Sequence, residues 1–212
     1  MQADEARPGQ VTPVPAAGNA AEGVPLAWWL VPSGPVARHW QAQIAQLARQ
    51  TGGPVFEPHL TLAMSWLPDG VDPRGLAPVL CQALAPLWLR VTAVDHGPAY
   101  FQSVFLRMVP AADGALAGQV AQLTTALDGL WPSQTVAPAF APHLSLVYGL
   151  LAEDRRQALV ATIVPPAGAV CFDTLVAVRP RPGARTLANV ADWDPFLRLS
   201  LVNTSSFPQK QG

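Results

Sequence analysis

The hydrophobic positions of the chain follow two different periods, and both recur between residues 26 and 202. Short apolar runs, several of them with a period of two, predict strands. These runs cover 26–31, 56–66, 87–94, 100–109, 140–147, 170–178 and 196–202. Apolar residues spaced by three or four positions predict amphipathic helices. The helical segments are 36–50, 74–84, 116–130 and 153–163.

Several of these segments end at residues that start or stop secondary structure. Gly52 and Gly53 are expected to end the first helix, and Asp113 is placed to cap the third. Pro78 lies inside the second helical segment and weakens that prediction. The turn His-Gly-Pro at 96–98 separates two strands and predicts a hairpin.

Helices and antiparallel strands are mixed in both halves of the chain, which predicts an α+β fold with two lobes. Residues 1–24 are rich in Ala, Pro and Gly and lack hydrophobic periodicity, so we expect a disordered leader. Residues 203–212 have the same character and are expected to form a flexible tail. A single bilobal domain is expected over 25–202.

Charge and cysteine content exclude several classes of protein. The 212 residues include 13 basic and 14 acidic side chains, a net charge of −1, which argues against a surface that tracks long nucleic acid. Cys81 and Cys171 are far apart and form no metal-ligand cluster, and we expect two buried thiols in a reducing compartment. No apolar stretch is long enough to span a membrane, and no signal peptide is evident. A cytoplasmic monomer that contacts no membrane is therefore expected.

One nine-residue motif occurs twice. Residues 56–64 read FEPHLTLAM and residues 140–148 read FAPHLSLVY. The copies share Phe, Pro, His and two Leu, and each follows a predicted helix. A single His-x-Thr or His-x-Ser is common and is more often structural than catalytic. Two matching copies in matching context favour a paired catalytic site.

Strand geometry explains what the two motifs can do. Residues two apart on a strand share a face, about 6.5 Å from each other, so His59 lies beside Thr61 and His143 beside Ser145. The intervening leucines face the opposite side and can pack beneath helices. Two imidazoles and two hydroxyls around one point suit a tetrahedral phosphate anion. Two histidines can share the general acid and general base roles near neutral pH.

The sequences His59-Leu60-Thr61-Leu62 and His143-Leu144-Ser145-Leu146 resemble the paired signatures of the 2H phosphoesterase superfamily. The flanking sequence is most similar to its cyclic phosphodiesterase branch, over about residues 26–200. The resemblance implies two pseudo-symmetric lobes, each an antiparallel sheet with flanking helices, around a central cleft. It also implies hydrolysis of ADP-ribose 1″,2″-cyclic phosphate or nucleoside 2′,3′-cyclic phosphates to phosphomonoesters, with no metal and no cofactor.

The resemblance also implies roles for particular residues of this chain. His59 and His143 would be the catalytic histidines, and Thr61 and Ser145 the hydroxyls that bind the phosphate. Tyr148 would lie near the cleft, although strand alternation turns it away from His143 unless the strand ends at the following glycine. His143 would be the base and His59 the acid, and the near-symmetry of the motifs leaves the reverse assignment open.

The other candidate residues carry weaker signals. His39 and His96 are interpreted as surface and turn residues. Five tryptophans are interpreted as core, and they are Trp28, Trp29, Trp66, Trp88 and Trp131. Trp66, Tyr100 and Phe101 are candidates for stacking on a nucleobase, and the sequence does not choose among them. The basic residues of one Pro/Gly-rich loop form either a solvated turn or a phosphate clamp; they are Arg179, Arg181 and Arg185.

Two other functions stay open at this stage. The first is an RNA 2′,3′-cyclic phosphodiesterase of the 2′-5′ RNA-ligase-like branch, which should carry more cationic surface than this chain does. The second is a non-catalytic nucleotide-binding module, which would not need two titrating groups. Turnover of a nucleoside 2′,3′-cyclic phosphate in the presence of EDTA would separate an enzyme from a binding module.

Overall fold

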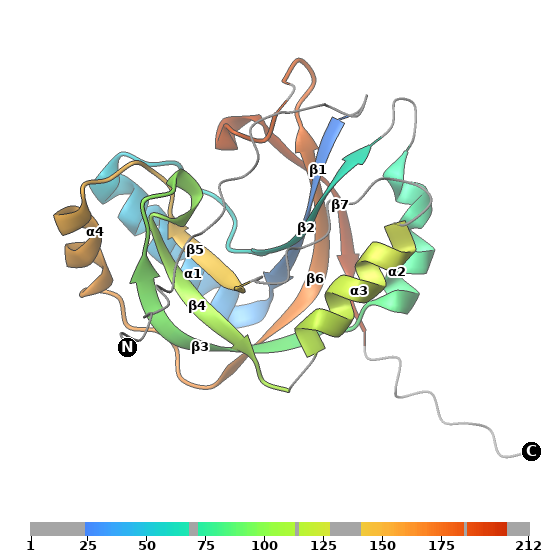
Figure 1. Ribbon diagram of the computed structural model, residues 1–212, viewed down its shortest axis with the longest axis horizontal. Helices are drawn as coiled ribbons and strands as arrows, with labels where there is room; N and C mark the ends of the chain where they lie inside the picture. Colours follow the sequence, from blue (N-terminus) through green and yellow to red (C-terminus); the bar gives the residue numbers. More distant parts are fainter. Residues whose placement is uncertain (1–23, 68–71, 113–114, 128–140, 185, 203–212) are drawn as a thin grey trace, which may run out of the picture.

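The computed structural model describes residues 24–67, 72–112, 115–127, 141–184 and 186–202 (Figure 1). The predicted leader and tail lie outside these ranges, except for residue 24. Asp113, Trp131 and Arg185 also lie outside them. The domain boundaries expected from the sequence therefore stay predictions.

The described residues form one seven-stranded antiparallel sheet with four α-helices. The strands are β1 (Val24–Pro32), β2 (Leu60–Leu67), β3 (Leu87–His96), β4 (Val104–Pro110), β5 (His143–Val147), β6 (Ala169–Pro180) and β7 (Trp193–Ser200). The α-helices are α1 (Gly34–Thr51), α2 (Ala77–Ala83), α3 (Ala115–Leu127) and α4 (Glu153–Val160). Short 3₁₀ turns cover Pro73–Leu76, Tyr100–Gln102 and Val190–Asp192. The fold is α+β, as the sequence predicts.

The strand order is β2-β1-β6-β3-β4-β5. Strand β7 lies off this path and pairs with residues 174–180 of β6, beyond the residues 169–172 that pair with β3. Strands β1, β2, β6 and β7 form one half of the molecule, and β3, β4 and β5 form the other. The first residues of β3 pair with the first residues of β6 and join the halves. The sheet curls strongly, and its two end strands, β2 and β5, come close to each other (Figure 1).

Helix boundaries follow local chemistry. Gly52 ends α1 in the left-handed conformation at φ 73°, and its N–H donates to the Ala48 carbonyl at 2.8 Å. Pro78 falls in the first turn of α2, where the missing N–H costs nothing, so the predicted helix over 74–84 divides into a 3₁₀ turn and a shorter α-helix. The prediction over 153–163 is too long by three residues, because α4 ends at Val160 in a further turn.

The predicted strand over 140–147 begins too early, because β5 starts at His143. Two other predicted strands are also too long. The prediction over 56–66 starts four residues early, because β2 begins at Leu60. The prediction over 100–109 is wrong at its start, where Tyr100–Gln102 forms a 3₁₀ turn and β4 begins at Val104. In both cases the apolar residues before the strand face the functional site described below.

The main hydrophobic core lies between the helices and one face of the sheet. It includes Trp28, Leu60 and Leu144 from the strands and Trp40 and Ile44 from α1, all of which are fully buried. A second, smaller cluster lies on the opposite face. Its buried members are Ala27, Trp29, Val31, Val176 and Val178. Strand β1 is therefore buried on both faces, which accounts for its uninterrupted apolar sequence.

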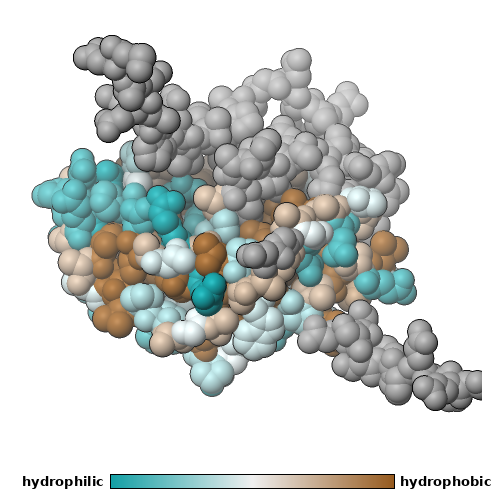
Figure 2. All heavy atoms as spheres, turned by 60° about the horizontal axis from the view of Figure 1, so that its bottom comes forward, coloured by the Kyte–Doolittle hydropathy of each residue, from teal (hydrophilic) through white to brown (hydrophobic). Residues whose placement is uncertain are grey.

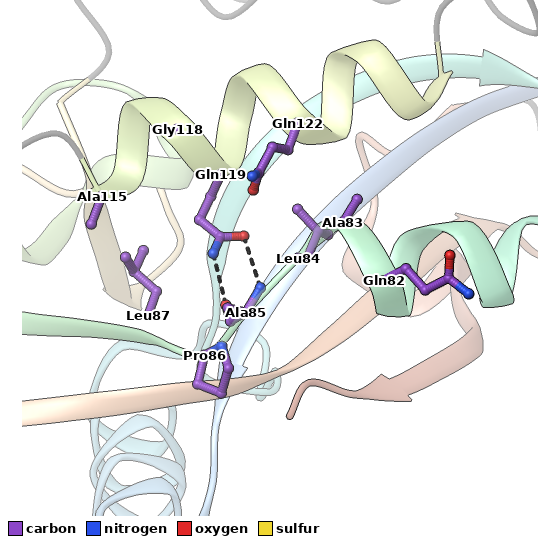
Figure 3. Close-up of a pocket in the computed structure, with 10 residues that line it drawn as sticks. All are labelled: Gln82, Ala83, Leu84, Ala85, Pro86, Leu87, Ala115, Gly118, Gln119 and Gln122. Atoms are coloured by element: carbon purple, nitrogen blue, oxygen red, sulfur yellow. Dashed lines mark hydrogen bonds between the residues drawn. The ribbon is translucent and has the colours of Figure 1, made fainter. Parts of the chain in front are cut away.

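Helices α2 and α3 pack against each other beside a pocket (Figure 3). Gln119 on α3 reaches the turn after α2, where its amide donates to the Ala85 carbonyl at 2.9 Å and its carbonyl accepts from the Ala85 N–H at 3.4 Å. The side chain thus replaces two backbone hydrogen bonds that the turn leaves open. None of the motif residues lines this pocket.

Three features relate to expectations from the sequence, and they are the exposed hydrophobic residues, the two thiols and the lengths of the helices. On the face shown in Figure 2, hydrophobic residues occur in separate groups among hydrophilic ones. Cys81 and Cys171 are free thiols, and both are half-buried rather than buried as predicted. Among the described residues, the helices are too short or too polar to cross a membrane.

Candidate active site

The two copies of the repeated motif lie on the end strands of the curled sheet. Thr61 is the second residue of β2, and His59 immediately precedes the strand. His143 and Ser145 are the first and third residues of β5. Because β2 and β5 lie close together, residues 84 positions apart in the chain face one site. His59 and Ser145 are buried, whereas Thr61 and His143 are half-buried.

Both histidines are held by the same local hydrogen bond. His59 Nδ1 lies 2.6 Å from the Glu57 carbonyl oxygen, and His143 Nδ1 lies 3.1 Å from the Ala141 carbonyl oxygen. A carbonyl only accepts, so Nδ1 carries the proton in each ring and Nε2 of the neutral ring has a free lone pair. Each copy of the motif therefore presents the same nitrogen for proton transfer.

Burial keeps both rings neutral near pH 7. Loss of hydration lowers the pKa of His59 from 6.5 to about 4, although the Glu57 carbonyl opposes this change; the nearby His143 lowers it further. Burial also lowers the pKa of His143, with the Ala141 carbonyl opposing and the Arg107 guanidinium adding to the decrease. The two motifs are similar in sequence but differ in electrostatic environment.

Tyr148 connects the two motifs, although strand alternation turns it away from His143. Strand β5 ends at Val147, so Tyr148 leaves the alternation and its side chain is buried. Its hydroxyl lies 3.4 Å from His59 Nε2, and it also interacts with the Ser145 hydroxyl. Burial raises the pKa of the phenol well above its usual range, so the hydroxyl keeps its proton and can donate.

The turn before β4 supports the second motif. The Ser145 hydroxyl donates to the Phe101 carbonyl at 2.7 Å, and the Gln102 side-chain amide lies 3.1 Å from His143 Nε2. This amide can donate to the lone pair of the ring, which agrees with a proton on Nδ1. Gln102 is a site residue that the sequence analysis missed, because nothing in its local pattern marks it.

Aromatic rings surround His59. Trp29 stacks on the imidazole with ring centroids 3.7 Å apart and planes 11° apart. Trp193, at the start of β7, contacts the edge of His59 at 5.9 Å and faces Phe101 at 6.2 Å with planes 26° apart. Trp29 is buried in the second hydrophobic cluster, as the sequence predicts, and it also forms part of the site. The pair Trp28-Trp29 could have indicated this position, because successive strand residues point to opposite faces and only one of them can face the main core. The interpretation of Trp88 as core is wrong, because this residue is 52% exposed, and Trp193 is a site residue without a sequence signal.

The remaining sequence candidates lie in less specific positions. Tyr100 is partly exposed beside Phe101, and Trp66 lies towards the far end of β2. Arg179 pairs with Asp194, and Arg181 donates to a backbone carbonyl, so the structure gives both a structural partner. His39 is exposed on α1, and His96 is the last residue of β3.

Comparison with known proteins agrees with this arrangement. The model of the family described as "Cyclic phosphodiesterase-like protein" matches residues 24–176. A protein of Arabidopsis thaliana named cyclic phosphodiesterase is 26% identical over 129 residues, which are 61% of this chain and 67% of that protein. Escherichia coli LigT complexed with phosphate covers 86% of this chain and 100% of its own, with a TM-score of 0.51 and 17% identity. LigT complexed with NADP⁺ has the same coverage, a TM-score of 0.52 and 17% identity.

The chain belongs to the cyclic phosphodiesterase-like family. It is thus an enzyme, a cyclic phosphodiesterase, and its fold is that of LigT. The family and enzyme class expected from the paired motifs are confirmed.

Proposed function

We propose that this enzyme hydrolyses a small cyclic nucleotide phosphate to a phosphomonoester without a metal ion. The substrate would be ADP-ribose 1″,2″-cyclic phosphate or a nucleoside 2′,3′-cyclic phosphate. The observation that carries the proposal is the pair of motif histidines on the two end strands of the curled sheet. Each has Nδ1 bound to a carbonyl and Nε2 directed at a polar side chain of the site, Tyr148 or Gln102. Membership of the cyclic phosphodiesterase-like family supports the reaction class.

The reaction needs one proton removed and one supplied. Nε2 of one histidine takes a proton from water, whose oxygen attacks phosphorus. The bond from phosphorus to one ribose oxygen breaks, and the second histidine donates a proton to that oxygen. Because burial favours the neutral form of both rings, this histidine must first take that proton from solvent. His59 and His143 fill these roles, and both end the cycle in the opposite protonation state. Exchange of one proton with solvent restores the enzyme.

Three hydroxyls would bind the phosphate. Thr61 is half-buried beside His59, and its side chain makes no hydrogen bond within the described part of the chain, so its proton is available to an anionic oxygen. Ser145 must turn its hydroxyl from the Phe101 carbonyl to donate to phosphate. Tyr148 keeps its proton and lies between the motifs. Donors aimed at the phosphate oxygens stabilise charge that develops during attack.

The two histidines differ in burial, and this bears on their roles. Burial lowers the pKa of the more buried His59 to about 4, so this ring stays neutral in the free enzyme, which favours it as the base. The family resemblance implies the reverse assignment. A substrate with an activated leaving group needs no acid, so it restores turnover in the variant that lacks the acid. Rescue of His143→Ala would assign the base to His59, and rescue of His59→Ala would assign it to His143.

A nucleobase could be recognised by the aromatic side chains next to the site. Phe101 and Trp193 face each other with nearly parallel planes, and base stacking on an aromatic side chain contributes about 1–3 kcal/mol. Of the three stacking candidates from the sequence, Phe101 faces Trp193 in this way, and Tyr100 faces Tyr148 with ring centroids 6.3 Å apart and planes 25° apart. Insertion of a base between the rings would require them to separate, because the present 6.2 Å is less than two stacking distances.

A substrate panel tests the proposal. The wild-type enzyme is assayed with ADP-ribose 1″,2″-cyclic phosphate, nucleoside 2′,3′-cyclic phosphates and a short RNA with a 2′,3′-cyclic end, each with and without EDTA. Turnover of the small substrates in EDTA, lost in the double variant His59→Asn/His143→Asn, is the expected result. Preference for the RNA would favour the RNA-ligase-like alternative, binding without turnover would favour the non-catalytic module, and loss of activity in EDTA would contradict the metal-free mechanism.

A further inference from the structure

The two motif copies differ at one non-conservative position within the shared sequence Phe-x-Pro-His-Leu. The first copy has Glu57, and the second has Ala141. These are the residues whose carbonyl oxygens accept the Nδ1 protons of the two histidines. The residue whose carbonyl accepts the Nδ1 proton therefore has a charged side chain in the first motif and a methyl group in the second. The contact is 2.6 Å in the motif that has the glutamate and 3.1 Å in the other.

The Glu57 carboxylate is bound from a distant part of the chain. Arg198 on β7 donates to it at 2.7 Å, and the two residues are 141 positions apart. The other ion pairs found among the described residues are Arg74–Asp72, Arg107–Asp95 and Arg179–Asp194, which join residues of a single turn or of adjacent antiparallel strands. The Glu57–Arg198 pair is different, because it ties the segment before β2 to a strand three positions away in the sheet.

Sheet register places Arg198 on the face of the site. Arg198 pairs with Val176, Val176 with Trp29, and Trp29 with Thr61, in one row across β7, β6, β1 and β2. Directly paired residues of antiparallel strands point to the same face. The arginine therefore lies on the same face as the ring that stacks on His59 and as the motif threonine. From there its side chain reaches the segment that carries the Glu57 carbonyl.

We propose that the Glu57–Arg198 ion pair is a positioning element that holds the Glu57 carbonyl against Nδ1 of His59 and so fixes the orientation and tautomer of that histidine. Glu57 and Arg198 are positioning residues, since neither contacts the reacting atoms. The role of His59 in catalysis rests on the function proposed above. The positioning itself is a property of the free protein and can be measured without substrate.

Electrostatics gives the proposal a signature that a purely structural role lacks. The Glu57 carbonyl favours the imidazolium of His59, burial and His143 oppose it, and the Tyr148 hydroxyl contacts the ring. Loss of either charge of the ion pair releases the Glu57 carbonyl, so both single variants lower the pKa of His59. General loosening of the fold would change the resonances of His143 as well.

The experiment compares Glu57→Gln, Arg198→Gln and the double variant with Asp194→Asn. The control removes the Arg179–Asp194 pair, which lies on the same hairpin and has similar side-chain exposure, 37% and 33% against 47% and 31%. ¹⁵N and ¹H NMR of the histidine rings gives the tautomer and pKa of His59, and His143 serves as an internal reference in the same spectra. Steady-state kinetics with a nucleoside 2′,3′-cyclic phosphate gives kcat and KM.

A lower His59 pKa in both single variants, with His143 unchanged, is expected. A decrease of about tenfold in kcat with little change in KM is expected for each, as for a misplaced catalytic group, and the double variant should lose no more than the worse single variant. Unchanged His59 resonances in Glu57→Gln, or equal effects in Asp194→Asn, would overturn the proposal. If the wild type turns over no cyclic nucleotide, the proposed function fails while the NMR result still decides the positioning role.

Discussion

The burial of His59 predicts that acid destabilises the folded protein through this one side chain. The pKa of the ring is about 4 in the folded state and 6.5 in the unfolded chain. Between these values the unfolded state binds more protons, so the free energy of unfolding decreases as pH falls from 6.5 to about 4. Above pH 6.5 the ring is neutral in both states and contributes no pH dependence.

The size of this effect follows from the difference between the two pKa values. Each pH unit over which only the unfolded state is protonated costs about 1.4 kcal/mol, so the interval from 6.5 to about 4 corresponds to about 3 kcal/mol. His143, whose pKa is also lowered, adds to the loss with the same sign. A domain of ordinary stability would lose a large part of its margin over this range.

Urea unfolding followed by tryptophan fluorescence measures the effect at a series of pH values between 7 and 4. The informative quantity is the difference between wild type and His59→Asn, since the amide can still donate to the Glu57 carbonyl but does not titrate. The variant should lose about 3 kcal/mol less than wild type over the interval. His39→Asn, which changes an exposed histidine on α1, should follow the wild type. An equal acid loss in wild type and His59→Asn would refute the reasoning.

Other predictions address the hydroxyls and the packing around them. Thr61→Val and Ser145→Ala should each raise the inhibition constant of inorganic phosphate and lower kcat/KM at least tenfold, because each removes a donor to an anionic oxygen; unchanged phosphate inhibition would remove that hydroxyl from the site. Tyr148→Phe should lower kcat about tenfold and leave the urea midpoint nearly unchanged, since its ring packing is kept; wild-type kcat would contradict the proposed contact with phosphate. Gly53→Ala should cost about 1–3 kcal/mol, because its Cβ would lie 2.8 Å from the Tyr148 carbonyl oxygen, whereas Gly75→Ala, with nothing within 4 Å of its Cβ, should change stability by less than about 0.5 kcal/mol.

Local pattern was sufficient to predict most elements and the four motif residues. Alternation of apolar and polar positions predicts β5 and most of β2, because successive side chains on a strand point to opposite faces of the sheet. It extended the first motif strand too far, because Phe56 and Pro58 are buried by packing before the strand begins. Burial alone therefore does not mark a strand start.

The residues that sequence reasoning missed reach the site through tertiary structure. Trp193 follows a turn region and has no periodic signal, yet the β6–β7 pairing brings it over His59. Gln102 and Phe101 contact His143 and Ser145 of the second motif from a 3₁₀ turn, where the sequence pattern predicts a strand. A contact that depends on sheet curl or on a strand pairing far along the chain leaves no trace in a local window.

The same limit explains why the acid and base roles were left open by the sequence. The motifs differ only slightly, and a pattern of residues carries no information on hydration. In the structure His59 has Trp29 stacked on one face and Trp193 at its edge, so it loses water that the half-buried His143 retains. Burial lowers the pKa of both rings, but the neighbouring charges differ, since His143 acts on His59 and Arg107 acts on His143. The asymmetry of the pair thus comes from the surrounding aromatic rings and from the ion pair that only the first motif has.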